Sequence, residues 1–67
     1  MTLRNLLMQL AREGCYPSIY RRGNLWRAHV NAGGNYWADN TTPLNALREA
    51  VCMWEVAGKP MDAREDE

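Results

Sequence analysis

Two glycine-containing pairs, Gly23-Asn24 and Gly33-Gly34, interrupt a run of alternating large and polar side chains between residues 18 and 39. Such a pair between alternating segments is typical of a tight β-hairpin turn. We therefore expect three antiparallel strands, at 16–22, 25–31 and 35–39, joined by two-residue turns. Pro17 predicts that the first strand lies at an edge, because proline cannot donate a hydrogen bond within a central ladder.

A helix is predicted on each side of these strands. Four leucines at i, i+3, i+4 and i+7 indicate a first helix over about 2–13, with Thr2 as its N-cap: Leu3, Leu6, Leu7 and Leu10. Thr42 and Pro43 begin the second helix, because proline at the first helical position loses no hydrogen bond. Its expected apolar stripe is Leu44, Leu47, Val51 and Trp54, and Gly58 and Pro60 end it.

The order of these elements predicts an α+β fold, a two-layer αβββα sandwich whose three-stranded antiparallel sheet has both helices on one face. We expect residues 1–61 to form a single domain and residues 62–67 to form an acidic flexible tail. A chain of 67 residues buries only about 60% of its unfolded surface, so its core is small. Domains of this size often depend on a disulfide, a metal or a partner.

Two-residue turns would fix the side-chain faces, because residues paired across a ladder lie on the same face. The first turn pairs Arg22 with Leu25 and Ser18 with His29. The second pairs Val30 with Trp37 and Asn31 with Tyr36. The expected core face carries Ile19, Trp26, Ala28, Val30 and Trp37. The expected open face carries Tyr16, Ser18, Tyr20, Arg22, Leu25, Arg27, His29, Asn31 and Tyr36.

This open face is the candidate binding site, since tyrosine and arginine are enriched at binding hot spots. The expected contact residues are Tyr16, Tyr20, Arg22, Arg27, His29 and Tyr36. The alternative is a solvated sheet face, where tyrosine is favoured by strand propensity alone. The second-helix residues Met53 and Trp54 are expected in the core because of their helical spacing.

Charge and cysteine content make several functions less favoured. The net charge is zero, with five arginines and one glutamate in residues 1–30 and most of the acids in 31–67. A nucleic-acid-binding protein usually has a net basic balance. Cys15 and Cys52 are expected as reduced core residues in the cytoplasm, one disulfide being the alternative, and one histidine with two cysteines gives no zinc spacing. No cofactor, metal site or membrane span is expected.

Catalysis is a further alternative. Ser18 is predicted beside His29, the single histidine of the chain, but no carboxylate is expected on that face to orient the imidazole ring. The chain is therefore expected not to be an enzyme.

Two stretches resemble known families. The segment "LLMQLAREGCYPSIYRRGNLWRAHV" resembles the opening of Hic-type mRNA-interferase toxins. Those carry a catalytic histidine in a Gly-Ser-His turn where this chain has Gly23-Asn24-Leu25, so ribonuclease activity is not implied. The segment "GGNYWADNTTPLNALREAVCMWEVAGKP" is similar to small phage and prophage αβ-sandwich proteins. The αβββα order is also that of double-stranded RNA-binding domains, whose lysine cluster at the second helix is here the single Arg48.

The phage resemblance implies a non-enzymatic accessory protein that binds and inhibits or modulates a host protein, with antiviral defence components such as CRISPR effectors among the expected targets. The alternative is an RNA-binding module that uses the same open face. A homodimer through the edge of the first strand is a further alternative.

Overall fold

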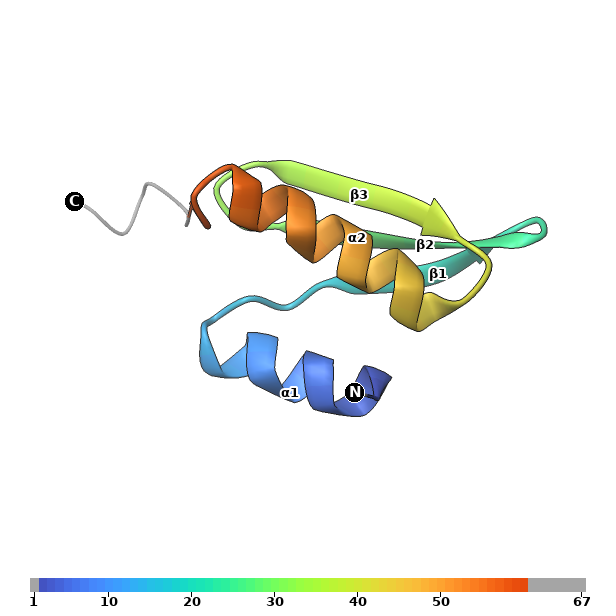
Figure 1. The fold of residues 1–67 in the computed structure, drawn as a ribbon, viewed down its shortest axis with the longest axis horizontal. Helices are drawn as coiled ribbons and strands as arrows, with labels where there is room; N and C mark the ends of the chain where they lie inside the picture. The colour runs from blue at the N-terminus through green and yellow to red at the C-terminus, as the bar shows by residue number, and fades with distance from the viewer. Residues whose placement is uncertain (1, 61–67) are drawn as a thin grey trace.

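The computed structural model describes residues 2–60, and the predicted tail at 62–67 lies outside this range. The order of elements is α1 (Leu3–Arg12), β1 (Ser18–Arg22), β2 (Leu25–Asn31), β3 (Asn35–Asn40) and α2 (Pro43–Val56) (Figure 1). The strands form an antiparallel sheet in the order β1-β2-β3. The predicted αβββα fold is confirmed.

Both helices begin at the predicted threonine caps. The Thr2 hydroxyl accepts a hydrogen bond from the Asn5 amide at 3.1 Å, and the Thr42 hydroxyl accepts one from the Asn45 amide at 3.1 Å. These bonds satisfy amides that have no partner within the first turn of a helix. Beyond α2 the chain turns at Gly58, where φ is 92°, and the Trp54 indole N–H donates to the Pro60 carbonyl at 2.8 Å.

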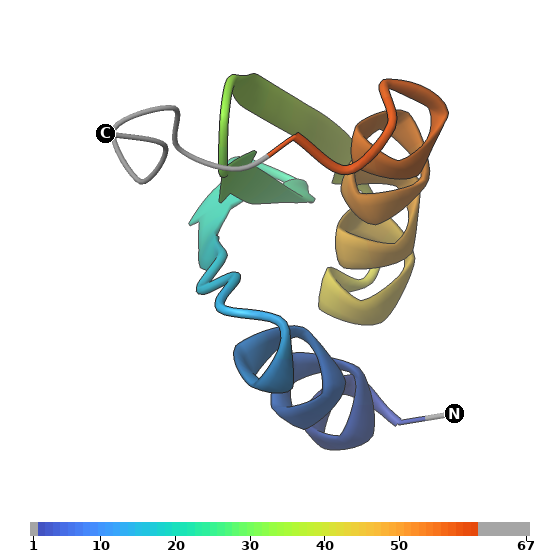
Figure 2. The same cartoon turned by 90° about the vertical axis from the view of Figure 1, so that its left-hand side faces the viewer.

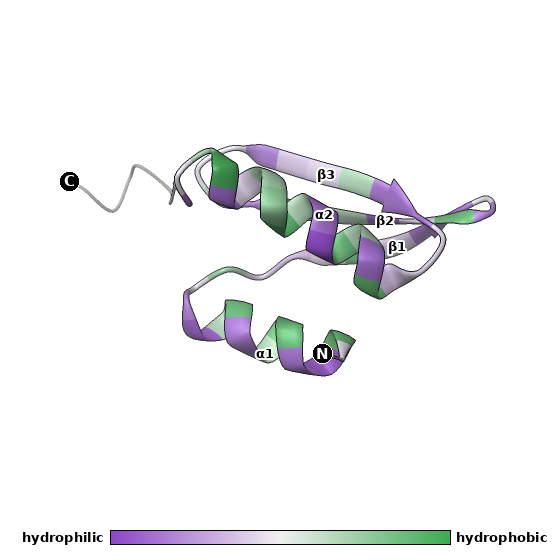
Figure 3. Ribbon diagram, in the orientation of Figure 1, coloured by the Kyte–Doolittle hydropathy of each residue, from purple (hydrophilic) through white to green (hydrophobic). Residues whose placement is uncertain are grey.

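Both helices lie on one side of the sheet (Figure 2). α2 packs against β2 and β3. Hydrophobic and hydrophilic residues alternate along both helices (Figure 3). The core lies between the layers, where Leu6 and Leu10 of α1 meet the buried side of α2 and the sheet. The largest fully buried side chains are Trp54, Leu47, Val30 and Cys15.

The predicted β1–β2 pairing is confirmed in full, from Ser18 opposite His29 to Arg22 opposite Leu25. Gly23 has a φ of 61°, and Asn24 keeps a negative φ. This combination fits the type II′ turn that glycine in the first central position favours.

The predicted β2–β3 pairing is wrong by one residue. Asn31 lies opposite Asn35, so the connection is the three-residue loop Ala32-Gly33-Gly34 rather than a two-residue turn. Both glycines have positive φ, 69° and 157°. Because successive side chains of a strand alternate between faces, the shift exchanges Tyr36 and Trp37. Tyr36 turns toward the core, where its ring covers Gly34, and Trp37 turns to the open face.

Three smaller predictions are also corrected. The first strand begins at Ser18, not at residue 16. Cys15 is buried as expected, but Cys52 is exposed, and both are free thiols. Met53 is exposed on α2, because α2 buries the stripe Ala46, Leu47, Ala50, Val51 and Trp54, and Met53 lies outside it.

Candidate binding surface

One side of the sheet carries no helix within residues 2–60 (Figure 2). We call this side the open face. The confirmed and corrected registers place on it Ser18, Tyr20 and Arg22 of β1, Leu25, Arg27, His29 and Asn31 of β2, and Asn35, Trp37 and Asp39 of β3.

Four of the six predicted contact residues come together on this face: Tyr20, Arg22, Arg27 and His29. Tyr16 is exposed but precedes β1, so the ladder does not fix its orientation. Tyr36 is not part of the face, because the shifted register turns it toward the core. Trp37 takes its place and is 49% exposed.

An ion pair lies at the centre of the open face. Arg27 Nε donates to Asp39 Oδ1 at 2.7 Å, and Arg27 Nη2 donates to Asp39 Oδ2 at 3.0 Å. This two-bond arrangement matches the planar guanidinium to the planar carboxylate. The hydrogen bonds lower the pKa of the Asp39 carboxyl and raise the pKa of the Arg27 guanidinium, so both groups are charged at neutral pH.

The same guanidinium covers an aromatic ring. Arg27 Cζ lies 4.1 Å from the centroid of the Trp37 ring, a distance at which the cation and the π-electrons attract each other. The ion pair with Asp39 therefore fixes the position of the Arg27 guanidinium, and this guanidinium packs against one face of the Trp37 indole. Tyr20 lies opposite Arg27 in the ladder and extends this group onto β1.

His29 lies two residues along β2 from Arg27, on the same face. Its Nε2 is 3.0 Å from the Asn35 side-chain oxygen, and Ser18 and Trp37 are its register neighbours. The expectation that no carboxylate lies on this face is wrong, since Asp39 is there. Both oxygens of that carboxylate accept hydrogen bonds from Arg27, and the group that orients His29 is the Asn35 amide.

The tip of the β1–β2 hairpin adds basic character at one end of the open face. Arg22 lies there opposite Leu25. Arg21 is on the other side of β1, where its Nε donates to the Gly23 carbonyl at 3.1 Å and its guanidinium lies 5.7 Å from the Trp26 ring centroid.

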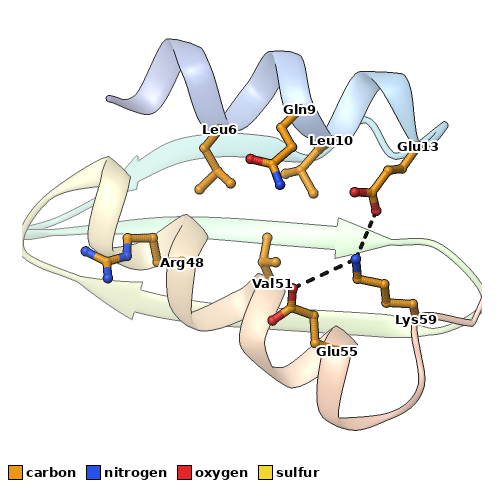
Figure 4. Close-up of a pocket in the computed structure, with 8 residues that line it drawn as sticks. All are labelled: Leu6, Gln9, Leu10, Glu13, Arg48, Val51, Glu55 and Lys59. Carbon is orange, nitrogen blue, oxygen red and sulfur yellow. Dashed lines mark hydrogen bonds and ion pairs between the residues drawn. The ribbon is translucent and has the colours of Figure 1, made fainter. Parts of the chain in front are cut away.

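A hollow of about 290 Å³ lies between α1 and α2 (Figure 4). Leu6, Leu10 and Val51 contribute its apolar lining. At one end Lys59 Nζ lies 3.2 Å from Glu13 Oε1 and 3.9 Å from Glu55 Oε2. Its ammonium group is thus paired with the carboxylate of the α1 C-cap residue and with a carboxylate of α2. These ion pairs connect the two helices at this end of the hollow.

Within residues 2–60, no group of three or more His, Cys, Asp or Glu side chains lies close enough to hold a metal ion. No helix in that range combines the length and the apolar character that crossing a membrane requires.

Comparison of the chain with models of known protein families, with curated protein sequences and with solved structures finds no match in any of the three. The open face is therefore the main basis for a functional proposal.

Proposed function

We propose that this chain is a non-enzymatic binding protein that contacts a partner protein through its open face. The observation that carries the proposal is the half-exposed Trp37, which stacks against Arg27 on a sheet face that no helix of residues 2–60 covers. Tyr20 and Leu25, 43% and 38% exposed, extend the apolar area across the other two strands. Exposed aromatic and arginine side chains of this kind supply most of the binding energy at protein interfaces.

The arrangement around Arg27 reduces the entropy that binding would cost. An isolated arginine loses rotamer freedom when it is fixed at an interface. Arg27 is already fixed by two hydrogen bonds to Asp39 and by its stacking on Trp37. A partner would therefore meet a pre-ordered surface.

The same ion pair favours a protein partner over RNA. Phosphate binding needs unpaired basic groups. Arg27 is instead neutralised by Asp39, whose carboxylate would repel a phosphate. RNA binding thus becomes an alternative outcome of the experiment described below.

The proposed partner is a host protein, and the proposed effect is inhibition or modulation of that protein. This part of the proposal rests on the resemblance that the sequence pattern of residues 33–60 suggests to small phage proteins, a class expected to act on host proteins. Within that class we propose a component of antiviral defence, such as a CRISPR effector, as the target.

The test is capture from a bacterial lysate with and without nuclease, followed by affinity measurement with the purified target. Trp37→Ala should weaken binding by about 2 kcal/mol or more, roughly a 30-fold rise in Kd, while circular dichroism remains unchanged. Met8→Ala is the control, because Met8 is similarly exposed but lies on α1.

Tyr16→Ala measures how far the surface extends beyond β1. Equal affinity of wild type and the Trp37 variant would overturn the proposal. Loss of capture on nuclease treatment, with affinity falling steeply as salt rises, would assign the open face to RNA instead.

A further inference from the structure

A second exposed apolar surface lies on α2, away from the open face. Glu49, Cys52, Met53 and Val56 follow the i, i+3, i+4, i+7 spacing of one helical stripe. Together with Tyr36 of β3 they line a groove of about 520 Å³. Met53 is 46% exposed and Val56 is 83% exposed, so this stripe leaves apolar area in water on the side of α2 that the core does not use.

The groove runs beside the free edge of the sheet. β3 is the last strand in the order β1-β2-β3, so its outer backbone groups have no strand partner within the described chain. In an antiparallel ladder, alternate residues bond to opposite neighbours. The register and the tight β1–β2 turn direct the backbone groups of Tyr36, Ala38 and Asn40 toward β2. Those of Asn35, Trp37 and Asp39 therefore point outward.

The β3 edge lacks the usual protection against pairing. Proline and lysine commonly block exposed edges. Neither occurs in β3, and its one charged residue, Asp39, is neutralised by Arg27. The β1 edge differs, because Pro17 precedes it and Arg21 and Arg22 end it.

We propose that a second copy of this chain covers the β3 edge and the groove, forming a two-fold symmetric dimer with a continuous six-stranded sheet. An antiparallel β3–β3 pair centred on Trp37 places Asn35 opposite Asp39 of the second copy. An amide then faces a carboxylate, so like charges do not meet.

The exposed stripe of α2 favours a second copy of this chain as the partner, because an unrelated strand would pair with the β3 edge but leave the stripe uncovered. The groove places Tyr36 beside the stripe whose midpoint lies between Cys52 and Met53. In the proposed dimer, the two-fold axis at residue 37 of β3 also relates the α2 stripes of the two copies. The two α2 helices run antiparallel across the axis, and their exposed stripes, which include Cys52 and Met53, face each other. One symmetry operation thus covers the sheet edge and the apolar stripe together, as a self-complementary interface requires.

The full chain tests this proposal in sedimentation experiments over a range of concentrations. Wild type should form a dimer. Met53→Glu should raise the dimer dissociation constant by roughly tenfold or more, because each dimer would bury two additional carboxylates in an apolar interface. Met8→Glu is the matched control, since Met8 is 51% exposed on α1, and it should leave the dimer unchanged.

A short bismaleimide should cross-link two chains through Cys52, since Cys15 is buried. Val56→Glu provides a second variant should Met53→Glu disturb α2, and circular dichroism monitors folding of each. A wild type that stays monomeric at all concentrations, or a dimer that neither α2 variant weakens, would overturn the proposal. Neither outcome depends on whether the open face binds a partner.

Discussion

Arg27 makes the two side-chain interactions that order the centre of the open face, the ion pair with Asp39 and the stacking on Trp37. Sequence reasoning predicted its position beside Tyr20, because the β1–β2 turn has a single favoured length. It did not predict the ion pair, which requires the register of β3. The side chain therefore differs from the expected free cation: it is neutralised by Asp39 and stacked on Trp37.

Asp39→Asn should lower stability at neutral pH and have a smaller effect in acid. The pKa of Asp39 is lowered in the folded protein by its hydrogen bonds from Arg27, so this pair stabilises the fold above the unfolded-state pKa of about 3.9. That contribution is lost as pH falls through the folded-state pKa. Urea unfolding of both proteins at neutral and acidic pH measures the change. An identical difference at both pH values would contradict the assignment. In an Arg27→Ala background, the effect of Asp39→Asn on stability should depend much less on pH.

The residues of the β2–β3 turn do not by themselves determine the register of β3. A Gly-Gly pair is compatible with loops of more than one length, so the local sequence left the register undecided. The predicted two-residue turn would have placed Asp39 opposite Ala28, which is fully buried. An unpaired carboxylate in that position costs free energy that the observed register avoids. The position of Asp39 in the sequence was therefore the available signal for both the register and the exposure of Trp37.

The three-residue loop makes a prediction about Gly33. Its φ of 69° is in the left-handed region, where a Cβ costs about 1 kcal/mol or more. Gly33→Ala should therefore reduce the free energy of unfolding by about that amount. Gly33→Asn should cost less, because asparagine tolerates this conformation better. Urea denaturation compares the two variants, and equal stabilities for alanine, asparagine and wild type would contradict the loop geometry.

At the scale of the whole molecule, the two helices contribute unequally. The sequence predicted both helices well, because caps and apolar spacing are local signals. Their relative contributions are tertiary properties. α2 buries five residues against the sheet, whereas α1 buries Leu6 and Leu10. The Lys59–Glu13 pair that joins α1 to the segment after α2 is exposed to solvent, and such pairs add little stability.

α1 should therefore open before the rest of the molecule unfolds. In native-state hydrogen exchange, the amides of α1 should exchange with a lower free energy than those of α2, because local stability follows buried apolar contact. Leu10→Ala should accelerate exchange mainly in α1. Leu47→Ala, which truncates a fully buried leucine of α2, should accelerate exchange throughout the chain and cost about 2–5 kcal/mol. Equal protection of both helices, with equal responses to the two substitutions, would mean that α1 and the sheet unfold as one unit.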